Sequence, residues 1–266
     1  MTTVLILSSH VATSDVGGSA QVVALARAGI GTVFAPTVLV GRHPGLGAAG
    51  GGPVDATTFT GMLDGIAAAG VFGTLDAVIT GYFASADQVA IAARTIDAAR
   101  AANPNVRVVV DPIMGDHGKG LYVNAAVADA IAVDLAPRAN LVAPNAWELE
   151  RLTGLTIGDS KTALIAVRSL GKAALVSSVA VGEEIGVVYA DEGEAWLASH
   201  ARRDSSPNGT GDLLTALFTA ARLDGATTEE ALRTSVSAVA EMATGAPVAV
   251  RVIRLTQSRT ILDGSV

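Results

Sequence analysis

Residues 208–223, NGTGDLLTALFTAARL, join a glycine-containing turn to an apolar helix and place one carboxylate, Asp212, where the two meet. The turn consists of Asn208, Gly209, Thr210 and Gly211. These residue types suit a tight turn whose backbone N–H groups point the same way. The apolar residues that follow recur at helical spacing, so we expect a helix to begin near Asp212. Amides and the helix dipole would attract a phosphate at such a start, whereas the alternative makes Asp212 an ordinary helix cap.

Composition limits the classes of protein that need to be considered. The chain has 266 residues, half of them hydrophobic but only 4% aromatic, which predicts a core of aliphatic side chains. A net charge of −7 and the lack of any Lys/Arg-rich run argue against nucleic-acid binding and against a polybasic membrane patch. The absence of cysteine excludes disulfides, a thiol nucleophile and Cys-bound zinc. No signal peptide or long apolar run is evident, so we expect a soluble cytoplasmic protein.

Short apolar runs of β type alternate with helical patterns along the chain. The runs are residues 4–8, 32–40, 75–80, 106–110, 140–143 and 173–177, and the helical patterns are residues 19–30, 85–102, 124–135 and 145–154. This alternation predicts right-handed βαβ units and a largely parallel sheet covered on both faces. Residues 184–190 and 194–200 instead predict an antiparallel hairpin. The glycine-dense residues 41–53 are expected to be mobile, and without a repeat or a linker we expect a single domain over residues 1–266.

Polar side chains follow nearly every predicted strand. They are Ser8, Ser9 and His10, then Thr80 and Tyr82, then Asp111, then Asn145 and Glu148, then Ser177 and Ser178. Ligands of open parallel sheets bind outside the carboxyl ends of the strands. Five strands therefore direct polar groups into one predicted crevice.

Seven segments resemble, in the same order, those of pyridoxal kinases of the ribokinase-like superfamily. They are SSHVATSDVGGSA, TGYFASADQ, VVVDPIMGDHGKGLYV, LVAPNAWELERLTG, ALVSS, DEGEAWLAS and GTGDLLTALF. GTGD alone is a weak signal, but its succession with DPIMG and PNxxELE is specific. The resemblance runs from about residue 4 to about residue 240 and implies a ribokinase-like three-layer α/β/α sandwich with a mostly parallel central sheet.

The resemblance implies a reaction in which the γ-phosphoryl group of ATP moves to the 5′-hydroxymethyl group of pyridoxal or a related B6 vitamer. Phosphoryl transfer needs positioning, charge neutralisation and a group that takes the alcohol proton. Asp212 is the candidate base. The amides of Gly209, Thr210 and Gly211 are the candidate anion hole. The family also implies a homodimer.

Magnesium prefers oxygen ligands and keeps several waters, so a few carboxylates and amides suffice. Asp111, Asn145 and Glu148 are the candidate metal ligands, and the last two match the NxxE element of the superfamily. A capping box formed by Asn145 and Glu148 is an alternative that is compatible with metal binding. Asp111 alternatively caps the turn before Pro112. A monovalent cation such as K⁺ remains open as a further cofactor.

The nucleotide is expected to contact Asp111, Lys119, Glu148, Ser177, Ser178 and Asn208. Lys119 lies in a segment similar to the lid-side loop of the family, although a solvated loop lysine is an equal alternative. Ser177 and Ser178 resemble residues near the nucleotide phosphates and are alternatively structural residues at a strand end.

The acceptor is expected to contact Ser9, His43 and Tyr82. The resemblance places Ser9 at the polar edge of the pyridine ring and Tyr82 as an aromatic wall. A strand-end serine and a half-buried core tyrosine are the structural alternatives. His43 lies in the segment that commonly reads Asn-His-Thr in the family, and it is alternatively a residue of the pocket rim or of local structure.

The same segment departs from the family pattern. Pro44 replaces a hydroxyl that usually faces the substrate, the next residues lack the usual aromatics, and Gly18 stands where Asn is usual. These departures lie in segments that are expected to contact the acceptor, whereas the residues that are expected to bind the phosphates match the family pattern.

Four other functions are weighed against this one. A hydroxymethylpyrimidine kinase of the same superfamily typically carries GTGC and an early GGAG segment, which this chain lacks. A sugar kinase is disfavoured because the early glycine pair for sugar binding is not evident. A non-catalytic vitamer-binding protein is opposed by Asp212. A dinucleotide-binding protein is excluded because no GxGxxG follows the first strand.

Overall fold

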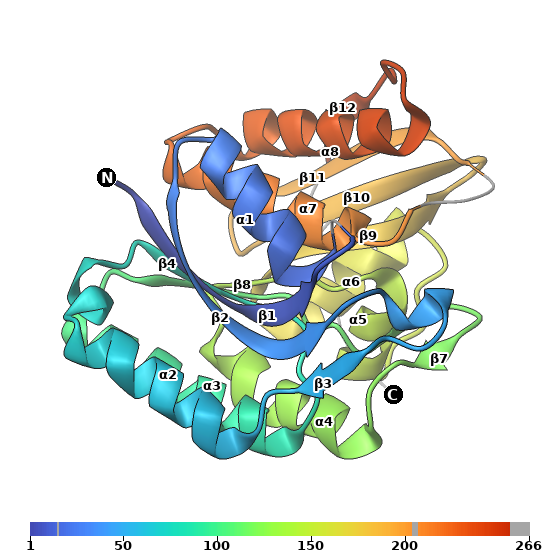
Figure 1. The fold of residues 1–266 in the computed structure, drawn as a ribbon. Coiled ribbons are helices and arrows are strands. Elements are labelled where there is room, and N and C mark those ends of the chain that lie inside the picture. Colours follow the sequence, from blue (N-terminus) through green and yellow to red (C-terminus); the bar gives the residue numbers. More distant parts are fainter. Residues whose placement is uncertain (15, 204–206, 256–266) are drawn as a thin grey trace, which may run out of the picture.

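The computed structural model describes residues 1–14, 16–203 and 207–255, and one ten-stranded sheet runs through this part of the chain (Figure 1). Its strand order is β12-β11-β10-β9-β8-β5-β4-β1-β2-β3. The strands are β1 (Thr3–Val11), β2 (Gly31–Val40), β3 (Gly51–Pro53), β4 (Ala77–Thr80), β5 (Arg107–Val110), β8 (Leu141–Val142), β9 (Ala173–Val181), β10 (Glu184–Ala190), β11 (Ala195–Ala201) and β12 (Arg251–Arg254). A separate hairpin is formed by β6 (Gly115–Asp116) and β7 (Gly120–Leu121).

The centre of the sheet is parallel and its two ends are antiparallel. Every pairing from β2 through β1, β4, β5 and β8 to β9 is parallel. The pairings from β9 through β10 and β11 to β12 are antiparallel, as is the pairing of β2 with β3. The predicted parallel sheet and the predicted hairpin at β10–β11 are both confirmed.

Helices cover both faces of the sheet (Figure 1). One face carries α1 (Gly17–Arg27), α7 (Thr210–Leu223) and α8 (Thr228–Thr244). The other carries α2 (Ala56–Ala68), α3 (Ala86–Ala102), α4 (Ala125–Ala130), α5 (Ala146–Thr153) and α6 (Ser160–Leu170). A π-helical turn, Ile131–Leu135, continues α4. The fold is therefore the predicted three-layer sandwich.

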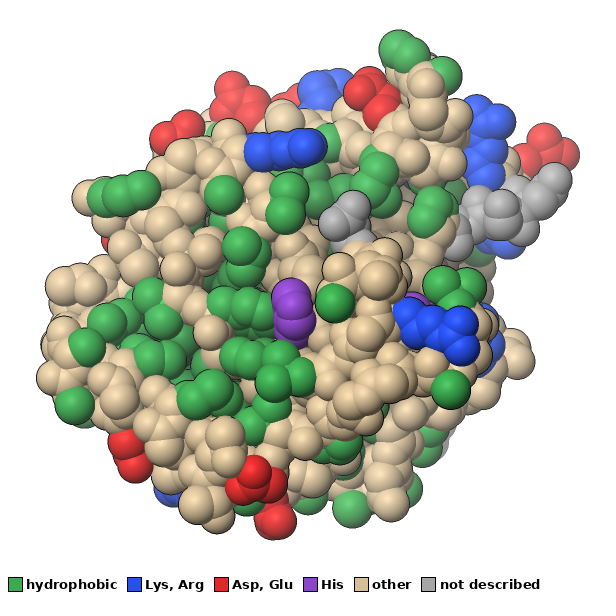
Figure 2. Space-filling view, in the orientation of Figure 1, with side chains coloured by type: hydrophobic (Ala, Val, Ile, Leu, Met, Phe, Trp, Pro, Cys, Tyr) green, Lys and Arg blue, Asp and Glu red, His purple; other side chains and the backbone are tan. Residues whose placement is uncertain are grey.

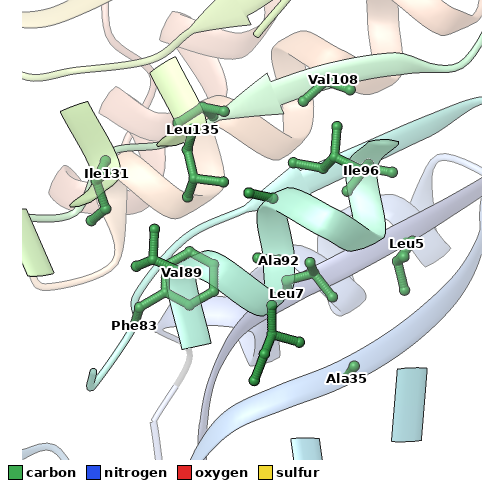
Figure 3. Close-up of a cluster of buried hydrophobic side chains, with 14 of the residues drawn as sticks. Leu5, Leu7, Ala35, Phe83, Val89, Ala92, Ile96, Val108, Ile131 and Leu135 are labelled. Atoms are coloured by element: carbon green, nitrogen blue, oxygen red, sulfur yellow. The ribbon is translucent and has the colours of Figure 1, made fainter. Parts of the chain in front are cut away.

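The core follows from the alternation of side chains along the central strands. Leu5 and Leu7 of β1 point into the cluster beneath α2 and α3 (Figure 3), whereas Val4 and Ile6 point into the cluster beneath α1 and α7. Both clusters consist mostly of aliphatic residues, as the composition predicts. Burying each such side chain contributes about 1.5–3 kcal/mol, so the two clusters hold both helical layers on the sheet.

Strand β1 is longer than predicted and takes Ser8, Ser9 and His10 into the sheet. The register with β2 shifts between Ser8 and Ser9, which pair with Pro36 and Val38, so that Thr37 is the extra residue of a β-bulge. Pro36 cannot donate a ladder hydrogen bond, which explains an irregularity at this place. The bulge lets pairing continue to Val11, beyond the expected end at residue 8.

The glycine-dense segment contains regular local structure, whereas its expected mobility stays a prediction. It contains a 3₁₀ turn, Pro44–Leu46, and the short strand β3, which pairs with the end of β2. Gly51 has φ +96°, and a Cβ atom there would lie 2.2 Å from the carbonyl oxygen of Leu39. Glycine at this position therefore permits the close approach of the two strands. Within the described residues, no helix is long and apolar enough to cross a membrane.

Two buried glutamines differ in how their amides are satisfied. Gln21 of α1 is fully buried, and neither its Oε1 nor its Nε2 has a hydrogen-bond partner among the described residues. Gln88 of α3 is also buried, but its Oε1 accepts from the Ala84 N–H at 2.9 Å and its Nε2 donates to the carbonyls of Thr37 and Val54 at 2.8 and 2.7 Å. A buried polar group costs free energy unless it is bonded.

Replacing each glutamine by methionine, which has a similar volume, is therefore expected to have opposite effects. Gln21→Met should raise the free energy of unfolding by about 1–2 kcal/mol. Gln88→Met should lower it by about 2–4 kcal/mol because the Ala84 N–H and the Val54 carbonyl lose this partner, whereas the Thr37 carbonyl still accepts from the Val54 N–H. Urea unfolding followed by circular dichroism measures both. A loss of stability in Gln21→Met as large as that in Gln88→Met would contradict the assignment of Gln21 as unsatisfied.

Candidate active site

The site is built around the start of α7. Gly209 is the N-cap residue and adopts a left-handed conformation with φ +88°, which glycine tolerates without strain. The helix begins at Thr210, two residues earlier than the sequence suggested, so Thr210, Gly211 and Asp212 lie in its first turn. First-turn N–H groups have no intrahelical acceptor, and the helix dipole adds positive potential. The turn therefore has the properties of an anion site.

Asp212 is almost completely buried, with 9% of its surface exposed. Its Oδ2 accepts a hydrogen bond from the Gly17 N–H at 2.8 Å, whereas its buried Oδ1 has no partner within the described residues. Burial raises the pKa of Asp212 to about 6, although hydrogen bonds from the backbone N–H groups of Gly17 and of Asp212 itself oppose this shift. One oxygen is thus held in place, and the other is buried without a hydrogen-bond partner in the described chain.

Gly17 is a site residue that the sequence reasoning missed. It has φ +60°, and a Cβ atom there would lie 2.2 Å from the Ser9 Oγ. Only glycine allows the start of α1 to lie this close to β1 and still direct its N–H group at Asp212. The segment DVGGSA was visible in the sequence, but no local pattern connected it with a residue 195 positions later.

Asp111 follows β5 and is buried close enough to Asp212 and Glu148 for their charges to act on it. Its Oδ2 accepts a hydrogen bond from the Thr215 Oγ1 at 2.9 Å. Burial raises the pKa of Asp111 well above its usual range, and repulsion from Asp212 and Glu148 adds to the shift. The structure thus brings these three predicted carboxylates together.

Asn145 and Glu148 form a capping box at the start of α5, so the capping alternative is confirmed. The Glu148 Oε2 accepts from the Asn145 N–H at 2.9 Å, and its Oε1 accepts from the N–H groups of Met114 and Gly115 at 2.8 and 3.3 Å. The Asn145 Nδ2 donates to the Gly115 carbonyl at 2.8 Å. Burial raises the pKa of Glu148 to about 7 against the opposing effect of these amides. The pair therefore fastens the loop after β5 to α5.

Ser177 and Ser178 lie at a bulge in β9. The register of β9 with β10 skips both residues, and Ser178 has φ +61°, a left-handed conformation that is unusual outside glycine. Both serines line a cavity of about 130 Å³ together with Thr210 and Gly211. The rest of its lining is Ile185, Gly186, Val187, His200, Arg203, Leu214, Val236, Val239, Ala240 and Ala243. The structure thus places the predicted phosphate turn beside a mostly apolar cavity.

Lys119 and Asn208 do not line this cavity. Lys119 is exposed at the turn of the β6–β7 hairpin, where its Nζ lies 5.8 Å from the centroid of the Tyr122 ring. Asn208 is exposed in the turn before Gly209. Their nucleotide contacts stay predictions.

Of the predicted acceptor residues, Ser9 lies near the end of β1 and Tyr82 follows β4, whereas His43 lies in the turn after β2. Ser9 borders Gly17 and hence Asp212. Tyr82 is half-buried against the core, and its N–H donates to the Ser8 Oγ at 3.3 Å. Burial raises the pKa of Tyr82. The His43 Nδ1 accepts from the Gly45 N–H at 3.1 Å and caps the 3₁₀ turn, which agrees with a local structural role.

Phe34 explains the departure at Gly18. A Cβ atom on Gly18 would lie 2.3 Å from Cε2 of the Phe34 ring and 3.2 Å from the Ser9 carbonyl oxygen. The ring of Phe34 also meets the His10 ring edge-on, with 6.1 Å between the centroids. An asparagine at position 18 would therefore collide with the ring of Phe34 as it stands here.

No group of three or more His, Cys, Asp or Glu side chains that could hold a metal ion occurs in the part of the chain that the structure describes. Because both Glu148 oxygens and the Asn145 side chain already bond to the chain, these two residues suit contacts to the waters of a magnesium ion. Asp111, which lies in the field of two further carboxylates, suits a direct contact.

The chain is similar in sequence to known kinases over most of its length. A family model described as phosphomethylpyrimidine kinase matches residues 30–251. A pyridoxine/pyridoxal/pyridoxamine kinase of Bordetella avium is 35% identical over 240 residues, covering 87% of this chain and 81% of that protein. A pyridoxal kinase of Leifsonia xyli is 32% identical over 247 residues, covering 90% and 87%.

Solved structures show the same fold. Pyridoxal kinase from Entamoeba histolytica has a TM-score of 0.89 at 24% identity and covers 96% of this chain and 100% of that one. Pyridoxal kinase from Leishmania donovani in complex with ADP has a TM-score of 0.85 at 23% identity, covering 91% and 86%. Since the family model and the sequence relatives span most of the chain, the protein belongs to the pyridoxal kinase family, within the ribokinase-like fold.

Proposed function

We propose that the protein is a kinase that transfers the γ-phosphoryl group of ATP to the 5′-hydroxymethyl group of pyridoxal, pyridoxine or pyridoxamine, giving the 5′-phosphate and ADP. The observation that carries this proposal is Asp212. It is a buried carboxylate at the start of α7, with one oxygen held by Gly17 and the other without a partner in the described chain, and the first-turn residues Thr210 and Gly211 beside it line a cavity. Family membership supplies the acceptor, because the relatives are named for the three vitamers.

In this mechanism the Asp212 Oδ1 accepts the proton of the acceptor hydroxyl as its oxygen attacks the γ-phosphorus. The bond from the γ-phosphorus to the bridging oxygen breaks, and ADP leaves with that electron pair. The amides of Gly209, Thr210 and Gly211 bind the equatorial oxygens of the moving group, where the dipole of α7 favours negative charge. The hydrogen bond from Gly17 keeps the carboxylate of Asp212 oriented.

The nucleotide is proposed to lie along the cavity that leads away from this turn. Its apolar walls from β10 and α8 suit the flat base, and Ser177 and Ser178 lie at the end that adjoins the phosphate turn. The solved Leishmania donovani kinase was crystallised with ADP, which supports this use of the fold. Magnesium, when bound, would neutralise charge on the phosphates, and Asp111, Asn145 and Glu148 are the residues that would hold it. A role for K⁺ stays a prediction.

A hydroxymethylpyrimidine kinase is the second candidate, because the matching family model bears the name phosphomethylpyrimidine kinase. Both reactions phosphorylate an aromatic hydroxymethyl group and need the same base. The part of the chain around Gly18, Phe34 and Pro44, which is proposed to face the acceptor, would determine which of the two acceptors is preferred. The full-length relatives favour the B6 vitamers.

The first test measures ADP release with MgATP and, in parallel, pyridoxal, pyridoxine, pyridoxamine and hydroxymethylpyrimidine. Asp212→Asn should lower the turnover of the preferred vitamer by on the order of 100-fold or more and keep nucleotide binding, because the proton acceptor is lost. Asp224→Asn, an exposed change at the other end of α7, is the matched control and should leave turnover unchanged. Equal turnover in the two variants would remove Asp212 as the base, and turnover on the pyrimidine alone would select the second candidate.

The pH dependence follows from the burial of Asp212. Because burial raises its pKa to about 6, kcat/KM should fall about tenfold per pH unit below pH 6 as the base becomes protonated. This loss is not acid unfolding. A carboxyl whose pKa is higher in the folded than in the unfolded chain binds protons preferentially when folded, so this group favours the fold as the pH drops from 7 to 5. Activity that stayed constant down to pH 5, with circular dichroism confirming the fold, would contradict the assignment.

A homodimer is part of the proposal. Hydrophobic side chains gather over α1 and β2 in Figure 2, and on these elements Val23 and Leu39 are 45% and 48% exposed. Apolar surface of this kind is often covered by another chain. Light scattering should give twice the mass of the chain, and a double Val23→Glu, Leu39→Glu variant should give the single mass; a monomeric wild type would reject the dimer.

The continuous sheet supports the single domain over residues 1–266, and a cytoplasmic location stays a prediction.

A further inference from the structure

Thr215 is a buried residue of α7 whose hydroxyl group points at the candidate site. It is 2% exposed, and its Oγ1 donates to the Asp111 Oδ2 at 2.9 Å across 104 residues of sequence. One turn further along the helix, the Thr219 Oγ1 donates to the Thr215 carbonyl at 2.7 Å. Two buried threonine hydroxyls on one helix therefore serve different partners, one across the fold and one within the helix.

The position of Thr215 on α7 connects the two carboxylates. Asp212 and Thr215 are three residues apart and so share a face of the helix. Asp212 is positioned by α7, to which it belongs, and by the hydrogen bond from the Gly17 N–H. Asp111 lies on a different element, after β5. The Thr215 hydroxyl is thus a bridge by which α7 also sets the position of Asp111.

Asp111 needs such a donor. Its carboxylate is buried, and the negative charges of Asp212 and Glu148 repel it. A buried carboxylate without a hydrogen-bond donor would move its oxygens toward water or away from the other two charges. A hydrogen bond to a charged group is worth more than one between neutral groups, so one well-placed hydroxyl is enough to hold the side chain.

We infer that Thr215 is a positioning residue, which holds the Asp111 carboxylate at the place where it meets the metal ion of the metal–nucleotide complex. This inference rests on the proposed function. The main effect of losing the hydroxyl is then weaker binding of MgADP and MgATP, with a smaller effect on the chemical step at Asp212.

The test compares two isosteric changes on the same helix. Thr215→Val removes the hydroxyl that reaches Asp111, and Thr219→Val removes the one that bonds within α7. Isothermal titration calorimetry should show MgADP binding about tenfold weaker in Thr215→Val, ADP binding without metal changed less than twofold, and wild-type behaviour in Thr219→Val. The KM for MgATP should rise more than kcat falls. Thr215→Ser, which keeps the hydroxyl, should restore MgADP affinity.

A second pair keeps the inference testable if valine disturbs the fold. Thr215→Ser and Thr215→Ala both lack the methyl group and differ only in the hydroxyl, so the difference in MgADP affinity between them isolates the hydrogen bond. Equal affinities in this pair, or equal losses in Thr215→Val and Thr219→Val, would overturn the inference. A wild type that binds MgADP but phosphorylates no vitamer would overturn the proposed function alone, because the binding comparison still decides the role of Thr215. A wild type that binds no MgADP would overturn both.

Discussion

The hydrogen bond from the Gly17 N–H to the Asp212 Oδ2 joins the starts of two helices that are 195 residues apart, and the geometry of the candidate site depends on it. It exists because Gly17 has no side chain to collide with Ser9 and because Gly209 allows the chain to turn directly into α7. The contact fixes one carboxylate oxygen and leaves the other without a hydrogen-bond partner in the described chain. A flexible carboxylate would lose orientational entropy each time a substrate bound, whereas this one is already oriented.

Three buried carboxylates near one another are a source of instability that the fold offsets with specific donors. Glu148 receives three backbone N–H groups, Asp212 receives that of Gly17, and Asp111 receives the Thr215 hydroxyl. No cationic side chain is among these donors. A divalent cation with its nucleotide would therefore meet no fixed positive charge from these donors, and its binding would favour the ionised form of the three carboxyl groups. A buried lysine or arginine would have stabilised the free protein at the expense of that affinity.

Local patterns predicted the layers, the parallel centre of the sheet, the β10–β11 hairpin and the placement of Asp212 at a helix start, because each depends on periodicity or turn chemistry within about 20 residues. They did not predict the bulge at Thr37, the left-handed Ser178 or the role of Gly17. Gly17 meets Asp212 across 195 residues of sequence, so no local pattern connects them. The irregular pairing at Thr37 and Ser178 lies between strands that are neighbours in sequence, but no turn residue or periodicity marks its position. The capping box of Asn145 and Glu148 shows that even a recognised motif predicts only part of its own contacts. The sequence predicted both residues, but the amides of Met114 and Gly115 that occupy the carboxylate come from another loop.

The two sides of the site are constrained to different degrees, and this explains where the chain departs from its family. On the phosphate side, Gly17, Gly209 and Asp212 depend on one another through backbone geometry, so a change at one would require changes at all. On the predicted acceptor side, the ring of Phe34 fills the space beside Gly18, and the segment around Pro44 is an exposed turn with few partners in the core. Side chains that only fill space can be exchanged in compensating pairs at small cost. In this chain the proposed phosphate chemistry therefore depends on backbone geometry, whereas the proposed acceptor side could change in shape without disturbing it.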